Sequence, residues 1–108
     1  MGKVKIQYSW DAVNDLDCIF DYISDDNKNA ARAMLDKIEK KLLCLGENQR
    51  LGTVIPTEAL SFIEPGYRKI IVEPYIVFYR IGKDEIFISR VLHSKQDWNQ
   101  LIFKSELN

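Results

Sequence analysis

The chain opens with alternating apolar and polar residues, and this pattern changes to a helical period near residue 10. Val4, Ile6 and Tyr8 alternate with lysine and glutamine, which predicts a half-buried first strand. Over residues 10–24, apolar side chains recur at helical spacing opposite an acidic and polar face. Ser9 stands where an N-cap residue belongs. We therefore expect a strand that leads directly into an amphipathic helix.

A second helical pattern follows after a short break. Residues 24–27 are serine, aspartate and asparagine, which favour turns and helix caps. Apolar residues then recur at helical spacing over about residues 28–45, and Gly46 is expected to end this helix. Because few residues separate the two helices, they should form an antiparallel hairpin.

The last third of the chain reads as three short strands. Residues 46–66 show no clear period and are expected to form a surface connector. Apolar runs then occupy residues 66–93, with turns at Pro74 and at residues 82–84. Connections this short cannot carry a parallel crossover, so the three strands are expected to form an antiparallel meander. Residues 96–103 are a candidate for a short terminal helix.

This element order predicts an α+β fold of the form β-α-α-β-β-β(-α). We expect a four-stranded antiparallel sheet with the helical hairpin packed on one face and the other face partly open. The length of 108 residues fits a single domain over residues 1–108.

Composition narrows the function classes. Fifteen basic and sixteen acidic residues give a net charge of −1, so the basic excess typical of nucleic-acid-binding proteins is missing. No apolar run approaches the ~18 residues of a membrane-spanning helix, and the N-terminus lacks the apolar middle of a signal peptide. We therefore expect a cytoplasmic protein with no membrane partner, in which Cys18 and Cys44 stay reduced. The sequence has no CxxC and no Cys/His cluster, so neither a metal nor a cofactor is implied.

Three side chains near strand ends could carry chemistry: Arg68, Arg90 and His93, the only histidine. Each also has a structural interpretation. The histidine could bond to the backbone or to Asp97, Arg68 could pair with an acid of a helix, and Arg90 could pair with a carboxylate across the sheet. Arg90 and His93 differ by an odd number of positions. They should therefore face opposite sides, and share a site only if the strand ends or bulges before His93.

Several segments in order carry a resemblance to a known family. They are Tyr8-Ser9-Trp10-Asp11-Ala12, Asp15-Leu16, Ile19-Phe20-Asp21-Tyr22-Ile23, Ala30-Ala31, Gly52, Glu58-Ala59-Leu60, Tyr67-Arg68-Lys69-Ile70, Tyr75-Ile76-Val77-Phe78-Tyr79-Arg80-Ile81, Ile88-Ser89-Arg90-Val91-Leu92-His93 and Gln96-Asp97-Trp98. Together they resemble the RelE/ParE toxin superfamily of bacterial toxin–antitoxin modules. The tail from His93 to Trp98 looks more like the ParE branch, the plasmid stabilisation type.

The resemblance implies a small toxin of a type II system, held inactive by a cognate antitoxin. ParE-like members poison DNA gyrase, whereas RelE-like members cut mRNA in the ribosome. For RNA cleavage, Arg68 and Arg90 match phosphate-binding positions, His93 loosely matches a general acid, and Glu58 could match a general base. For target binding, the candidates are Arg68, Arg80, Arg90 and Trp98.

Departures from the nuclease pattern favour the gyrase interpretation or an inactive relative. The connector from Thr53 to Glu64 has no lysine, and no tyrosine follows His93. A protein of net charge −1 is also poorly suited to the polyanionic ribosome. We therefore expect a ParE-like gyrase inhibitor. A RelE-like ribonuclease and a non-toxic binding module remain as alternatives, so whether the protein is an enzyme stays open, as does a homodimer.

Overall fold

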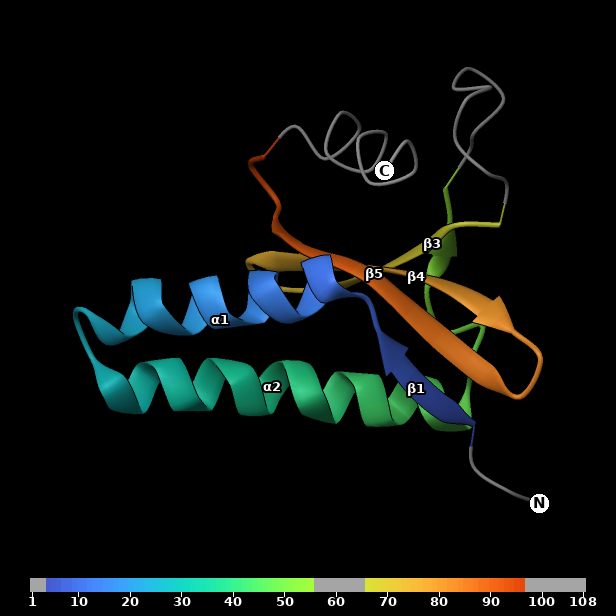
Figure 1. Ribbon diagram of the computed structural model, residues 1–108, viewed down its shortest axis with the longest axis horizontal. Coiled ribbons are helices and arrows are strands. Elements are labelled where there is room, and N and C mark those ends of the chain that lie inside the picture. The colour runs from blue at the N-terminus through green and yellow to red at the C-terminus, as the bar shows by residue number, and fades with distance from the viewer. Residues whose placement is uncertain (1–3, 56–65, 97–108) are drawn as a thin grey trace.

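Two antiparallel helices cover one face of a five-stranded sheet in the computed structural model, which describes residues 4–55 and 66–96 (Figure 1). The elements in order are β1 (Lys5–Tyr8), α1 (Trp10–Ser24), α2 (Lys28–Glu47), β2 (Thr53–Val54), β3 (Arg68–Val72), β4 (Tyr75–Gly82) and β5 (Glu85–His93). Neither helix is long and apolar enough to cross a membrane. The predicted α+β class and the helical hairpin are confirmed.

Both helices begin at the predicted capping residues. The Ser9 hydroxyl accepts a hydrogen bond from the Ala12 amide at 2.9 Å, and Asn27 Oδ1 accepts one from the Ala30 amide at 3.1 Å. These side chains satisfy amide groups that have no partner within the first turn of a helix. The end of the second helix differs from the prediction. It runs through Gly46 to Glu47, because the fully buried Leu45 keeps this last turn packed on the core.

The sheet corrects the prediction of four antiparallel strands. Its order is β1-β5-β4-β3-β2, and β1 pairs with β5 in parallel, from Lys5 opposite Glu85 to Tyr8 opposite Ile88. From β1 the chain passes through the helical hairpin to β2 at the opposite edge of the sheet, and it returns through β3 and β4 to reach β5. The additional strand, β2, pairs antiparallel with the start of β3. A strand of two residues is too short to show a period, so β2 could not be predicted from the sequence pattern. Most of the predicted terminal helix, 96–103, lies outside the described residues.

The core lies between the helices and the sheet. Its buried members from the two layers include Ala12, Ile19, Ile38, Leu42, Leu45, Ile70, Val77, Tyr79, Ile86 and Ile88. The other sheet face is less open than expected, because Ile76, Phe78 and Leu92 are also buried although they lie outside this core cluster. Ile71 and Phe87 remain exposed.

One core tyrosine holds the loop that leaves α2. The Tyr79 hydroxyl donates to the Gln49 carbonyl at 2.9 Å and accepts from the Gly52 amide at 2.9 Å. The side chain of Tyr79 is fully buried, so both bonds are sheltered from water. The Tyr79 ring and the Lys69 carbonyl fill the space that a Cβ at position 52 would need, so only glycine fits there.

Gly52→Ala should destabilise the fold. The added Cβ would lie 2.5 Å from the Lys69 carbonyl oxygen and 2.6 Å from the Tyr79 hydroxyl. We expect a loss of about 1–3 kcal/mol in the free energy of unfolding, measured by urea denaturation. Gly46→Ala is the matched control. Gly46 lies within α2, where a Cβ meets nothing closer than 3.9 Å. Alanine there should raise the free energy of unfolding by up to about 1 kcal/mol, because it favours the helix more than glycine does. Equal effects of the two substitutions would contradict this packing argument.

Candidate functional site

The second half of β5 has a helix beside it in place of a strand. The first strand ends at Tyr8, opposite Ile88, so β5 continues past it with one edge uncovered by β1. Two side chains satisfy this edge, one from the N-cap residue of α1 and one from within the helix. The Ser9 hydroxyl donates to the Ser89 carbonyl at 2.7 Å, and Asp15 Oδ2 accepts from the Val91 amide at 2.9 Å. The edge is therefore closed by side chains of the helix.

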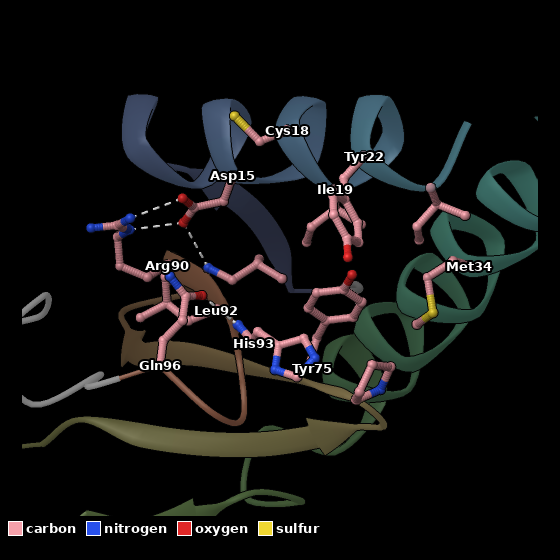
Figure 2. Close-up of a pocket in the computed structure, with 13 residues that line it drawn as sticks. Asp15, Cys18, Ile19, Tyr22, Met34, Tyr75, Arg90, Leu92, His93 and Gln96 are labelled. Carbon is pink, nitrogen blue, oxygen red and sulfur yellow. Dashed lines mark hydrogen bonds and ion pairs between the residues drawn. The ribbon is translucent and has the colours of Figure 1, made fainter. Parts of the chain in front are cut away.

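Asp15 also binds the Arg90 guanidinium through two bonds, drawn as dashed lines in Figure 2. Nε lies 2.8 Å from Oδ2, and Nη2 lies 2.9 Å from Oδ1. The side chains of Arg90 and Asp15 are only 16% and 10% exposed, so water screens the pair weakly. The hydrogen bond to Asp15 is the main cause that raises the pKa of Arg90 above its ordinary value, and burial partly opposes it. The predicted carboxylate pairing is confirmed, but its partner comes from α1 and not from across the sheet.

His93, at the end of β5, is held by local bonds. Its Nδ1 accepts from the Lys95 amide at 3.1 Å, and its own amide donates to Gln96 Oε1 at 2.8 Å. The ring meets the Tyr75 ring edge to face, with centroids 5.5 Å apart. A neutral imidazole in this position carries its hydrogen on Nε2, because Nδ1 is an acceptor. The expected bonding to the backbone is confirmed, and Asp97 lies outside the described residues.

These groups line a pocket of about 730 Å³ between α1 and the adjacent ends of β4 and β5 (Figure 2). Its lining residues are Asp15, Cys18, Ile19, Tyr22, Ile23, Met34, Pro74, Tyr75, Arg90, Val91, Leu92, His93 and Gln96. The hydroxyl groups of Tyr22 and Tyr75 point toward one another across it. Burial is the main cause that raises the pKa of Tyr75, followed by the nearby Tyr22. The pocket thus combines aromatic and apolar walls with a few polar groups, as ligand and partner sites commonly do.

Arg90 and His93 both line this pocket although they lie on opposite faces of β5. A bulge places Ser89 between the pairs Tyr79–Ile88 and Phe78–Arg90, and the register is then regular to His93. Arg90 and His93 therefore start from opposite faces, as the odd spacing requires. Both nevertheless line the pocket, because the guanidinium of Arg90 reaches Asp15 at the strand edge. The strand does bulge before His93, as the prediction required, but this bulge at Ser89 also precedes Arg90 and leaves the parity of the two residues unchanged.

Arg68 lies away from this pocket. It pairs with Tyr79 in the register, and its Nη2 donates to the carbonyls of Gly52 at 3.1 Å and Arg50 at 3.4 Å. Its Nε is buried without a hydrogen-bond partner. Within residues 4–55 and 66–96, no helix carboxylate forms the ion pair that the sequence suggested for it. Arg68 instead helps Tyr79 to hold the loop after α2.

Of the remaining candidates, the described residue Arg80 does not line the pocket. The guanidinium carbon of Arg80 lies 5.4 Å from the centre of the Tyr67 ring. Glu58 and Trp98 fall outside the described residues, so their assigned roles stay predictions. The described part of the chain holds no cluster of three or more residues suited to a metal ion.

Sequence reasoning missed Asp15, Tyr22 and Tyr75 as members of the site. The helical pattern placed Asp15 on the polar face of α1, among other acids that are exposed. Nothing in one sequence marks which acid meets a strand edge 75 positions later. Paired changes at positions 15 and 90 in related sequences would be such a signal.

A family model described as the ParE toxin of the type II toxin–antitoxin system parDE matches residues 6–98. The chain belongs to the ParE toxin family. A candidate toxin from Sinorhizobium fredii, Y4kP, is 30% identical to it over 105 residues, which cover 94% of this chain and all of that protein.

Solved structures agree with this family at the level of the fold. A protein of the chromosomal ParDE system of Pseudomonas aeruginosa is similar with a TM-score of 0.67 and 24% identity, over 84% of this chain and 96% of that one. A chain of the YoeB–YefM complex from Staphylococcus aureus has a TM-score of 0.56 and 18% identity, over 85% and 98% of the two chains. This ParE family chain therefore shares the architecture of toxin–antitoxin proteins.

Asp15→Ala should cost about 3 kcal/mol in the free energy of unfolding, because it leaves the Arg90 guanidinium and the Val91 amide without their acceptor. Urea denaturation measures this loss. Asp17→Ala, at an exposed position of the same helix, is the control and should change it by less than about 0.5 kcal/mol.

A double-mutant cycle isolates the pair itself. Arg90→Met removes the charge and keeps an apolar stem, and the double variant with Asp15→Ala should be less destabilised than the sum of the single variants, by about 1–3 kcal/mol. Additive effects would show that the contact is not energetically coupled.

Proposed function

We propose that this ParE family toxin acts by binding DNA gyrase and not by cutting RNA. The family description, a toxin of a type II toxin–antitoxin system, supports the general role. The specific target follows from the resemblance to the ParE branch and from the way in which the structure uses its arginines.

The observation that carries the proposal is the separation of Arg68 from Arg90. They pair with Tyr79 and Phe78, which are consecutive in β4 and so direct their side chains to opposite faces. Arg68 is bonded to loop carbonyls, whereas Arg90 is held by Asp15. Phosphate cleavage needs cationic groups that converge on one phosphate. Because the two guanidinium groups are held by different partners and only Arg90 lines the pocket, they do not converge, and this favours a protein that acts through surface binding.

An antitoxin partner belongs to the same proposal. Toxins of type II systems are held inactive by a cognate protein, and the similar YoeB is found in a complex with YefM. The pocket beside α1 is a candidate for part of that contact, because its walls are largely aromatic and apolar. A small reading frame beside the gene is the expected source of this partner.

Purified toxin should inhibit supercoiling by gyrase and trap cleaved DNA. The experiment incubates relaxed plasmid with gyrase, ATP and the protein, and then measures linear DNA after detergent and protease treatment. Topoisomerase IV in the same assay is the control for specificity. Expression in cells should also induce a DNA-damage response. Growth arrest without gyrase–DNA complexes and without that response would contradict the proposed target, and undisturbed growth would favour a non-toxic binding module.

A second candidate function, ribosome-dependent cleavage of mRNA, is favoured by one observation: Arg90 and His93 line the same pocket. If His93 is the general acid, His93→Ala should reduce cleavage of ribosome-bound message by about 10²–10⁴-fold. Primer extension on message from induced cells measures this. Lys95→Ala, an exposed neighbour, is the control and should leave cleavage unchanged. Intact message in cells that express the wild-type toxin would exclude this function.

A further inference from the structure

One edge of the sheet is left open beside α2. The short strand β2 pairs with β3 only at Arg68 and Lys69. From Ile70 to Val72, no other described strand lies on that side of β3. An open edge presents unpaired backbone groups, and it can accept a strand from another chain.

The neighbouring contacts show which backbone groups face this edge. The Lys69 carbonyl faces the loop after α2, since a Cβ on Gly52 would lie 2.5 Å from its oxygen. The Glu73 carbonyl accepts a bond from Lys37 Nζ at 3.2 Å. Backbone groups of alternate residues point to the same side of a strand. The N–H and C=O of Ile71, two residues after Lys69 within β3, therefore point outward along the open edge, and the Ile71 side chain is 52% exposed.

A basic groove runs beside these groups. It has a volume of about 380 Å³ and lies between α2 and β3. Lys37, Lys40, Lys41 and Cys44 line it from the helix, and Ile71, Val72 and Glu73 line it from the strand and the turn after it. Three lysines against one glutamate give this groove a positive charge in a protein of net charge −1. Such a local field attracts an acidic partner.

We propose that this groove binds an extended, acidic segment of a partner protein, which joins β3 as an additional edge strand. Its backbone pairs with the N–H and C=O of Ile71. In a strand of alternating acidic and apolar residues, the carboxylates face Lys40 and Lys41 while the apolar side chains lie on the face of Ile71. Nucleic acid would use the lysines but not the strand edge, so the peptide fits the observations better. The groove is separate from the pocket beside α1, and the proposal holds whichever target the toxin has.

The test uses a seven-residue peptide of alternating glutamate and valine with blocked ends, titrated into the purified protein by calorimetry. We expect binding that weakens as salt is added. The double variant Lys40→Glu/Lys41→Glu should weaken it by about tenfold or more. The matched control is Lys28→Glu/Arg32→Glu, which makes the same change in charge at the other end of α2 and should leave the affinity unchanged. If both double variants lose affinity for the peptide equally, the effect comes from net charge alone, and the proposal is overturned.

A second pair of variants tests the strand edge. Ile71→Pro removes the outward N–H without removing a bond to β4, and should weaken binding by about tenfold. Ile71→Ala keeps the N–H and should retain most of the affinity. Circular dichroism checks that both variants fold. If the proline variant fails to fold, the backbone pairing is tested in the peptide instead. A peptide with proline in place of each valine lacks the N–H groups for pairing and should not bind.

Three results would overturn the proposal. The first is that the proline-containing acidic peptide binds as tightly as the glutamate–valine peptide. The second is that the glutamate–valine peptide does not bind at millimolar concentration. The third is that a single-stranded oligonucleotide binds more tightly than the peptide and that its binding is lost in the same lysine variants.

Discussion

The contact between Asp15 and the uncovered edge of β5 governs how α1 sits on the sheet. One carboxylate accepts from the Val91 amide and from two nitrogens of the Arg90 guanidinium. Apolar packing alone would hold α1 against the sheet, but it is not directional. The charged hydrogen bonds set the position of the helix along β5, and with it the wall of the pocket. Figure 2 shows the α1 side of the pocket, where Asp15, Ile19 and Tyr22 extend from the helix toward the strands.

The second half of β5 and the second half of β3 each have an edge with no described strand beside it, and the two edges differ in how their backbone groups are satisfied. At β5, side chains of Ser9 and Asp15 take the place of the missing strand. At β3, Lys37 donates to the Glu73 carbonyl just past the uncovered stretch, and the Ile71 backbone faces outward. One edge is thus closed from within the chain, whereas the other is open to a partner. A small toxin that must be restrained by another protein can use such a surface.

The periodicity of apolar residues predicted the helices of this fold but not the pairing of its strands. The two helices were predicted almost to their ends, because amphipathic spacing and capping residues are local properties of the sequence. The parallel pairing of β1 with β5 was missed, since it joins residues 80 positions apart and no local pattern states which strand will be a neighbour. The two-residue strand β2 pairs with β3 next to the point where Gly52 is bonded to Tyr79 and Arg68, both of which are distant from it in sequence.

The sequence by itself determined the α+β class, the helical hairpin, the family and the presence of Arg90 and His93 near one strand end. These follow from residue types, spacing and order, which are local or cumulative along the chain. Only the tertiary structure decided that Arg90 is held by Asp15, that Arg68 serves the loop after α2, and that Tyr22 and Tyr75 complete the pocket. The physical reason is that side-chain partners are chosen by register, by a bulge at Ser89 and by the place where β1 stops. Each of these depends on contacts between distant parts of the chain.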